Sequence, residues 1–366
     1  MAPPTAARGI ARLPRRLLSL SGRDATSFLQ GMMSTALLTR DGSLIRRPAL
    51  SSAVYSGLFT PNGRVLHDML VYPRPPADSS QDMPDYLVEV DGEEAARLAK
   101  RLRFYKLRAK FNMKVLDPEE LGVYHVWDDA GSEKIASLEG KIGEGNMLCE
   151  DPRLSALGYR LLAPGGKTPE LGFDEVDGDS YKVRRYLHGI PENQDEIPLE
   201  SALPLEYNME LMNGVDFQKG CYVGQELQAR TRYLGVVQKR VLPCLLYDGE
   251  APAALEYSPT TAGGASAAAV EGGAGIDRIR REGDPPPSRR DRKPGKWITG
   301  VGNVGLAICR LAAMTDVVPP HPPDMPMKLA YSPEDEFKID AAGGEVKVKA
   351  FVPEWVRKGL EGYRGE

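Results

Sequence analysis

Residues 216–230 read DFQKGCYVGQELQAR. Gly220 and Gly224, on either side of a cysteine, permit backbone conformations that a side chain forbids, so a sharp turn costs little there. The residues that follow are good helix formers, with an acid in the first turn of the expected helix. The pattern therefore predicts that Cys221 lies close to the N-terminus of a helix.

Two interpretations of Cys221 stay open from chemistry alone. The helix dipole and the ammonium of Lys219 both favour the thiolate, which attacks electrophiles or binds metal. Cysteine is also among the most buried residue types, so Cys221 can simply fill a strand-to-helix junction. Of the other cysteines, Cys244 and Cys309 lie in apolar, strand-like runs and are expected to be inert core residues, whereas acidic neighbours disfavour a thiolate at Cys149.

Length and composition limit the class of protein. At 366 residues the chain exceeds the usual size of one compact domain, so two or three packed units are expected. A net charge of −4 gives no sign of a DNA partner, and no run approaches the roughly 18 apolar residues of a membrane span. The cysteines form no C-x-x-C pair, which argues against a self-contained zinc site and a disulfide framework and suggests a reducing compartment.

The N-terminus allows two interpretations. Residues 1–23 carry five arginines and no acid before Asp24, which suits a mitochondrial transit peptide. An ordinary basic N-terminal strand has the same composition, and three prolines spoil a long amphipathic helix. Both interpretations stay open.

The first third of the chain alternates strand-like and helix-like segments. Its hairpin is the clearest element, because Pro61-Asn62-Gly63 supplies turn chemistry between two segments that alternate in character. The order of elements predicts an α+β domain with antiparallel sheets. The predicted strands are 16–21, 53–60, 64–72 and 86–90, and the predicted helices are 24–33 and 93–104.

The middle of the chain repeats this pattern, and the end differs from it. Residues 251–296 are rich in alanine, glycine, proline and arginine and cannot bury enough apolar surface, so we expect this low-complexity insertion not to fold. Short strands after it predict a small β domain. The predicted elements are strands over 121–127, 157–162 and 236–247, a helix over 180–187, and short strands within 298–311 and 345–355.

A basic run extends from Lys100 to Lys114, with seven cations and no acid. It can receive an anionic ligand, an acidic partner or RNA. The alternative is a solvated helix face that runs into a charge-protected strand edge. Only three aromatic residues lie in the run, so stacking on single-stranded nucleic acid has little support.

Residues 211–231, LMNGVDFQKGCYVGQELQART, resemble the signature of the folate-binding family related to the glycine-cleavage aminomethyltransferase. Within it they resemble the branch of iron-sulfur cluster assembly factors that includes the bacterial YgfZ proteins. Four other stretches agree with this family: LSLSGRDATSFLQGMMS at 18–34, FTPNGRVLHDMLVY at 59–72, RFYKLRAKF at 103–111 and GVGNVGLAICR at 300–310.

The resemblance implies a fold and its subdomains. The expected architecture is a GcvT-like ring of three subdomains around a central cavity, with two α+β halves with antiparallel sheets and a C-terminal β-barrel. The first, folate-binding-like subdomain is expected at 13–120, the second, which carries the KGCYVGQE motif, at 121–235, and the barrel with its insertion at 236–366.

The sequence departs from the aminomethyltransferases in two places. In those enzymes an acid that holds the pterin precedes the glycine of the segment that resembles residues 185–189, and here Leu187 and His188 stand there. They also have a catalytic aspartate in the helix that here offers only Glu93 and Glu94. A folate-dependent one-carbon (aminomethyl) transferase, which lacks its expected acid-base groups, is therefore kept as the alternative. A structural module with Cys221 as buried packing is a second alternative.

The leading hypothesis from the resemblance is an accessory factor in the maturation of 4Fe-4S proteins in the mitochondrial matrix, more an assembly factor than a conventional enzyme. One cysteine cannot hold a cluster, so the resemblance implies a 2Fe-2S cluster shared with an A-type iron-sulfur scaffold protein, with client 4Fe-4S apoproteins served indirectly. Cys221 is then a cluster ligand or a sulfur-handling thiol. The motif residues are Lys219, Gly220, Cys221, Tyr222, Gly224, Gln225, Glu226 and Arg230.

The resemblance also suggests a role for the individual motif residues. Lys219 is expected to tune the charge of Cys221, the two glycines to let a partner's backbone approach, and Glu226 with Arg230 to orient the loop. Tetrahydrofolate is a further expected ligand. Its candidate binding residues are Arg64, Lys106 and Arg108.

Overall fold

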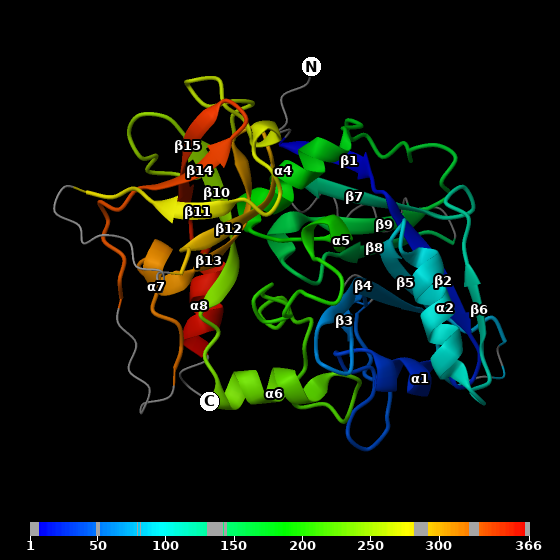
Figure 1. Cartoon of the computed structure of the whole chain (residues 1–366). Coiled ribbons are helices and arrows are strands. Elements are labelled where there is room, and N and C mark those ends of the chain that lie inside the picture. The colour runs from blue at the N-terminus through cyan, green and yellow to red at the C-terminus, as the bar shows by residue number, and fades with distance from the viewer. Residues whose placement is uncertain are drawn as a thin grey trace. The chain divides into compact units, whose positions relative to one another are not determined.

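The chain forms two compact units (Figure 1). The first comprises Met1–Tyr181, Glu192–Pro204 and Met209–Ala229, and the second comprises Lys182–Pro191, Leu205–Asn208 and Arg230–Glu366. The computed structural model describes residues 7–48, 52–78, 80, 82–129, 142, 145–281, 292–321 and 329–362.

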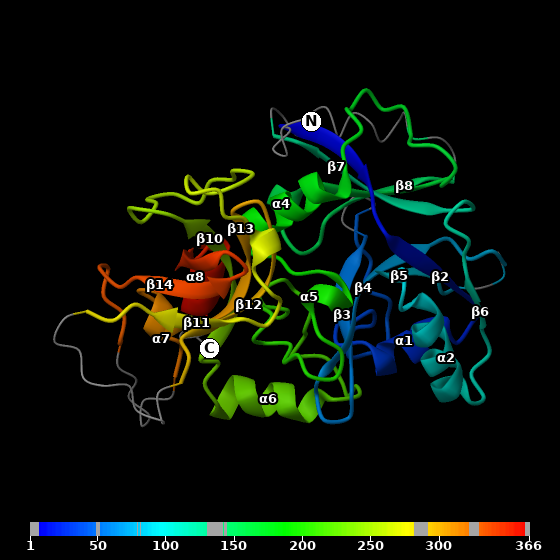
Figure 2. The same cartoon turned by 45° about the horizontal axis from the view of Figure 1, so that its top comes forward.

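The first unit contains an antiparallel sheet in the order β3-β4-β5-β2-β6. Helices α1 (Ala25–Met32) and α2 (Ala95–Lys106) share one hydrophobic core with it (Figures 1 and 2). The predicted hairpin is confirmed, but every residue of β3 is buried, so both faces of this strand are covered where the sequence predicted alternation. The strands are β2 (Arg15–Ser21), β3 (Val54–Phe59), β4 (Val65–Arg74), β5 (Asp85–Asp91) and β6 (Asn112–Val115).

A second antiparallel sheet in the same unit has the order β1-β7-β9-β8. Its edge strand β1 (Arg8–Arg12) was not predicted, and it lies outside the 121–235 range expected for this subdomain. Because β1 and β2 both carry arginines of the N-terminal stretch, the interpretation of that stretch as basic strand is confirmed for these two segments. The remaining strands are β7 (Gly122–Asp128), β8 (Met147–Glu150) and β9 (Tyr159–Ala163).

Short helical segments lie within and after the second sheet. The 3-10 turn η2 (Ser155–Leu157) lies between β8 and β9. The predicted helix near 180–187 is confirmed as α4 (Gly178–His188), and α5 (Asn193–Glu196) comes next. The helix predicted after Gly224 is confirmed as α6 (Gln225–Leu234).

The second unit contains a closed antiparallel barrel in the order β10-β13-β12-β11-β14-β15. It confirms the predicted C-terminal barrel, and together with the two antiparallel sheets it confirms the α+β class. Its strands are β10 (Lys239–Tyr247), β11 (Gly275–Arg278), β12 (Gly295–Val301), β13 (Val304–Arg310), β14 (Phe337–Ala341) and β15 (Gly344–Ala350). Three helical segments accompany them: η3 (Ala267–Ala269), α7 (Leu311–Met314) and α8 (Glu354–Gly362).

The expectation that residues 251–296 do not fold is wrong where the structure describes them. Strand β11 pairs with both β12 and β14, and its Ile276 is fully buried. Ala267 and Val270 are buried as well. Local composition misled the prediction because the rest of the barrel, not the insertion itself, supplies the partners that bury these few apolar side chains. Residues 282–291 lie outside the described residues.

A cluster of ion pairs, here called the buried charge cluster, lies inside the first unit and was not predicted. Arg15 begins β2, and its guanidinium contacts Glu89 of β5 (Nε–Oε1 2.5 Å) and Asp68 of β4 (Nη1–Oδ2 3.3 Å). Each charged member of the cluster is at most 2% exposed. The members are Arg15, Asp68, Glu89, Asp151, Arg153, Arg160 and Glu192.

The buried charge cluster links the two sheets of the first unit. Arg160 of β9 in the second sheet approaches Glu89 of the first sheet (Nη2–Oε1 3.7 Å) and hydrogen-bonds Glu192. Arg153 binds both Glu192 (2.8 Å) and Asp151 (2.7 Å). Charges removed from water are tolerated only when paired, so each pair restrains the elements that carry it.

Titratable groups around the cluster respond to this environment. Burial raises the pKa of Asp68 even with Arg15 beside it. Burial also acts to raise the pKa of Asp151, but Arg153 and Arg160 more than offset it and lower this pKa to about 2. Burial, aided by Arg160, lowers the pKa of His125 to about 3. At neutral pH the cluster therefore contains an ionised Asp151 and lies beside a neutral His125.

Replacement of Arg160 tests the contribution of the cluster. Arg160→Met should lower the free energy of unfolding by about 3–5 kcal/mol, because it leaves buried carboxylates without their partner. Urea unfolding followed by circular dichroism measures this change. As a control, Arg12→Gln removes the exposed ion pair with Glu119 and should cost at most about 1 kcal/mol. A similarly small loss for Arg160→Met would contradict the assignment.

Candidate functional site

Cys221 is exposed, whereas Cys149, Cys244 and Cys309 are buried. The prediction that Cys244 and Cys309 are core residues is confirmed, since both are 0% exposed. The burial interpretation of Cys221 is wrong. Among the four thiols, the structure therefore leaves one accessible to reagents or partners.

A turn starts the loop that carries this thiol. The Oδ1 atom of Asp216 accepts hydrogen bonds from the backbone N–H groups of Gln218 (2.8 Å) and Lys219 (3.2 Å). The N–H of Asp216 in turn donates to the carbonyl of Ser34 (2.9 Å). An aspartate that bonds to its own backbone two residues on is a common turn device, and here it fixes the entry to the cysteine loop.

Lys219 is buried beneath this loop, where it binds the end of α1. Its ammonium donates to the carbonyl oxygens of Gln30 (2.7 Å), Met33 (2.6 Å) and Thr35 (3.3 Å). These carbonyls lie at and just after the C-terminus of the helix, where a cation is favoured. Burial lowers the pKa of Lys219 to about 8, while Asp216 acts in the opposite direction.

The expected role of Lys219 as a tuner of Cys221 stays a prediction, and the structure shows a second role for this lysine. Its three hydrogen bonds all go to carbonyl oxygens of the α1 terminus, and its charge also faces the Tyr222 ring at 5.1 Å. The physical reason is that a buried ammonium needs several acceptors, which the helix end provides. Lys219 anchors the loop.

The other side of the loop packs against the β3–β4 hairpin. The ring of Tyr222 is 7% exposed, and its centroid lies 6.2 Å from that of Phe59. Gly224 has φ +84°, and a Cβ there would lie 2.4 Å from the carbonyl oxygen of Thr60. Only glycine fits this close approach.

The two glycines of the motif thus differ in role. Gly224 was expected to admit a partner's backbone, but its close neighbour is the chain's own hairpin. At Gly220 an added Cβ would meet no atom within 4 Å, and the residue is exposed. Of these two glycines, Gly220 is therefore the one with open space beside it.

Helix α6 begins at Gln225 and is held to the same hairpin. The side-chain amide of Gln228, 1% exposed, donates to the carbonyl of Gly63 (2.6 Å). Sequence analysis missed Gln228, because its partner is 165 residues away and nothing in the sequence distinguishes it from neighbouring polar residues. Glu226 and Arg230, which were expected to orient the loop, are exposed and make no hydrogen bond or ion pair within the described residues. Their expected role stays a prediction, whereas Gln228 holds the start of α6 to the hairpin.

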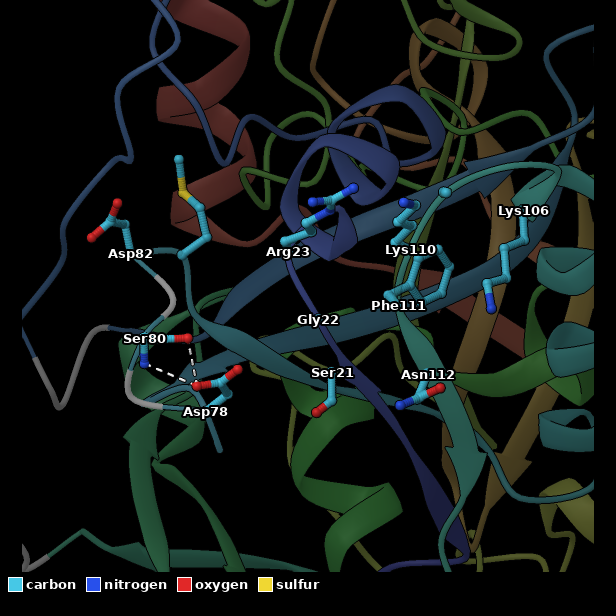
Figure 3. Close-up of a pocket in the computed structure, with 12 residues that line it drawn as sticks. Ser21, Gly22, Arg23, Asp78, Ser80, Asp82, Lys106, Lys110, Phe111 and Asn112 are labelled. Atoms are coloured by element: carbon cyan, nitrogen blue, oxygen red, sulfur yellow. Dashed lines mark hydrogen bonds between the residues drawn. The ribbon is translucent and has the colours of Figure 1, made fainter.

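The three predicted folate-binding residues are not brought together in one described pocket. Arg64 donates to the carbonyl of Ser201 (2.8 Å), and Arg108 is exposed. Lys106 alone lines a cleft of about 980 Å³ (Figure 3). Figure 3 places Lys106 and Lys110 on one side of this cleft and Asp78 on the other.

The cleft and the cysteine loop are associated with opposite ends of α1. Gly22 and Arg23, just before the helix, line the cleft, whereas Lys219 binds the carbonyls at its far end. Eight residues of helix separate these ends by about 12 Å. The cleft is therefore a separate feature from the Cys221 loop.

The positions that depart from the aminomethyltransferases lie at the end of one helix and just before the start of another. Leu187 and His188 end α4, and the His188 carbonyl accepts a hydrogen bond from the indole N–H of Trp355 (3.0 Å). Glu93 is exposed, and Glu94 pairs with Arg97 (3.5 Å) at the start of α2. Leu187 and His188 are not acids, and Glu93 and Glu94 are the two glutamates noted above. The pterin-binding acid and the catalytic aspartate of the aminomethyltransferases therefore have no further replacement at these positions.

Two further properties of the described residues bear on the site. Within the residues that the structure describes, no group of three or more His, Cys, Asp or Glu side chains is placed to hold a metal ion. In the described part of the chain, Cys221 therefore does not belong to a group of side chains that could bind a metal ion together. None of the helices formed by the described residues is long and apolar enough to cross a membrane.

The fold as a whole matches a solved aminomethyltransferase. The crystal structure of the glycine cleavage system aminomethyltransferase T from Bartonella henselae aligns with a TM-score of 0.63 over 96% of this chain and 87% of that one, at 11% identity. The family model for the CAF17 C-terminal beta-barrel domain matches residues 278–358. The chain is thus a protein of the aminomethyltransferase fold with an exposed cysteine on a fixed loop.

Curated relatives define the family more closely. Two mitochondrial proteins named iron-sulfur cluster assembly factor IBA57 homolog, from Pyricularia oryzae and Neurospora crassa, are 41% and 42% identical over 94% and 95% of this chain and 84% and 81% of their own length. A third, from Coccidioides immitis, is 39% identical over 97% of this chain and 84% of its own. The chain belongs to the IBA57 family of mitochondrial iron-sulfur cluster assembly factors.

The two motif glycines provide a matched test of the loop geometry. Gly224→Ala should lower the free energy of unfolding by about 1–3 kcal/mol, because the residue combines a positive φ with a close backbone contact. Gly220→Ala should change it by less than about 0.5 kcal/mol. Urea unfolding of both variants measures the difference. Equal effects at the two positions would contradict the proposed seating of the loop on the hairpin.

Proposed function

We propose that this chain acts in the mitochondrial matrix as an accessory factor in the maturation of 4Fe-4S proteins, together with an A-type iron-sulfur scaffold protein. The cluster is the cargo of this process, carried as a 2Fe-2S cluster shared between the two proteins. Cys221 supplies a ligand or a sulfur-handling thiol, and client apoproteins are served indirectly.

The observation that carries the proposal is the exposure of Cys221 above buried neighbours. Gly220 and Cys221 are exposed. The residues on either side of this pair are buried: Lys219 is 8% exposed and Tyr222 is 7% exposed. A thiol that is exposed on a fixed loop can be presented to a partner with little loss of conformational entropy. This is the arrangement needed to donate a ligand to a cluster that another protein carries.

A partner is required by the count of ligands. A 2Fe-2S cluster takes four protein ligands, and the described residues place no further metal-ligating group with Cys221. Thiolates of a second protein are the natural source of the others. The open space at Gly220 supports this view, because it leaves room for the backbone of that protein beside the thiol.

Tetrahydrofolate stays a prediction. A likeness at 11% identity supports the fold and not the ligand of the aminomethyltransferase. Lys106, Arg108 and Arg64 do not line one described pocket. No separate structural observation therefore supports folate binding, and a folate-dependent transfer remains the weaker alternative.

Reconstitution with the scaffold protein tests the proposal. The full chain, an A-type scaffold protein, iron and sulfide are combined without oxygen, and the mixture is separated by size exclusion with visible absorption recorded. The wild type should co-elute with the scaffold and the cluster. Cys221→Ser should reduce the cluster-bearing complex at least tenfold, because a hydroxyl is a much poorer ligand than a thiolate.

The matched control is Gln218→Ser, a change at an exposed position in the same loop that leaves the thiol in place. It should form the complex as the wild type does. An undiminished cluster-bearing complex with Cys221→Ser would remove the cysteine from this role. Loss of the complex with both variants would indicate that the loop surface, and not the thiol, is what the scaffold protein needs.

A further inference from the structure

A basic cavity lies in the barrel of the second unit, outside the site described above. Its volume is about 530 Å³, and we call it the barrel cavity. Its described lining contains no acidic side chain. Five cationic side chains line it, namely Lys239, Arg292, Lys293, Lys296 and Arg310.

Strand pairing brings these charges together. Lys239 on β10 lies directly opposite Arg310 on β13. Two residues earlier on β13, Ile308 lies opposite Lys296 of β12. The backbone N–H of Arg310 also donates to the carbonyl of Pro294 (2.8 Å). Like charges that face each other across an antiparallel pair destabilise a sheet. The barrel therefore carries an electrostatic cost at this point.

Glycines make room for two of the lysines. A Cβ on Gly275 would lie 2.5 Å from the Nζ atom of Lys293, and a Cβ on Gly273 would lie 3.3 Å from the Cε atom of Lys296. Both glycines line the barrel cavity. The two lysine side chains thus lie across bare backbone just before and at the start of β11.

Carboxylates neutralise only part of this charge. Lys293 pairs with Asp277 (2.9 Å), and Lys239 lies 3.4 Å from Glu206. The other three cations, Arg292, Lys296 and Arg310, have no carboxylate partner among the described residues. Burial and the nearby guanidinium of Arg292 both lower the pKa of Arg310, and the carboxylate of Glu206 offsets only part of this effect.

We propose that the barrel cavity binds a small polyanion with two or more phosphoryl groups. Its volume falls within the range of small-molecule sites, roughly 300–1,000 Å³. Three unpaired cations match the charge of a di- or triphosphate, and a guanidinium binds two phosphoryl oxygens at once. The ligand relieves the repulsion between facing strands, so binding also stabilises the barrel.

Titration with sodium tripolyphosphate tests this proposal on the full chain. Calorimetry at 150 mM KCl should detect binding by the wild type, with an affinity that falls as salt rises. Lys296→Gln should weaken binding at least fivefold, and Lys296→Gln with Arg310→Gln at least twentyfold. The side chain of Lys296 is exposed and makes no hydrogen bond or ion pair within the described residues, so its single variant should keep the fold even if the double variant does not.

The control is a double variant that removes two positive charges of the same unit outside the cavity. Lys338 and Lys358 lie in β14 and α8, and each has its own carboxylate neighbour. Lys338→Gln with Lys358→Gln should change the affinity by less than twofold. A loss equal to that of Lys296→Gln with Arg310→Gln would mean that net charge alone attracts the anion, and it would overturn the proposal.

Further probes separate the sources of the phosphoryl groups. ATP that binds more tightly than tripolyphosphate would assign a nucleotide, and equal affinities would assign the polyphosphate chain itself; both support the proposal. Three results would contradict it: no binding of either probe, inorganic phosphate bound as tightly as tripolyphosphate, or binding of a ten-nucleotide RNA while both small probes fail. The last would make this face a nucleic-acid surface.

Discussion

The first unit depends on charges that are paired away from water. The guanidinium groups of Arg15 and Arg160 both reach Glu89, one from each sheet, so a single carboxylate joins two layers of the fold. Such pairs add little net stability compared with apolar packing, but the loss of one partner is costly because the other remains buried. They therefore fix the relative position of the elements that carry them more than they strengthen the unit.

That restraint extends to the cysteine loop through one strand. β4 carries Asp68 of the buried charge cluster. The hairpin turn just before β4 packs against Gly224 and accepts the hydrogen bond from the side-chain amide of Gln228. On the other side of the loop, Lys219 holds the end of α1, which packs in the same core as this sheet. A thiol between two such anchors is placed by the fold and not by its own sequence neighbours. The motif is best understood as a rigid platform for one cysteine.

The sequence predicted the class of fold, most strands and helices, and the motif, because these depend on periodicity, turn chemistry and a specific resemblance. It did not predict β1, β11 or the buried charge cluster, since each acquires its partners from distant parts of the chain. The same limit applies at the site. The sequence predicted that Cys221 lies just before a helix, as it does. The hydrogen bonds of Lys219 could not be predicted from its neighbours in sequence, because its acceptors are more than 180 residues away. Gln228 was missed for the same reason.

The fold exposes one thiol of four and holds it on a fixed loop. Brief alkylation of the native, reduced chain with iodoacetamide, followed by peptide mass spectrometry, measures this exposure. Cys221 alone should be modified rapidly, with Cys149, Cys244 and Cys309 modified only after unfolding in urea. Protection of Cys221, or equally fast modification of a second cysteine, would contradict this arrangement.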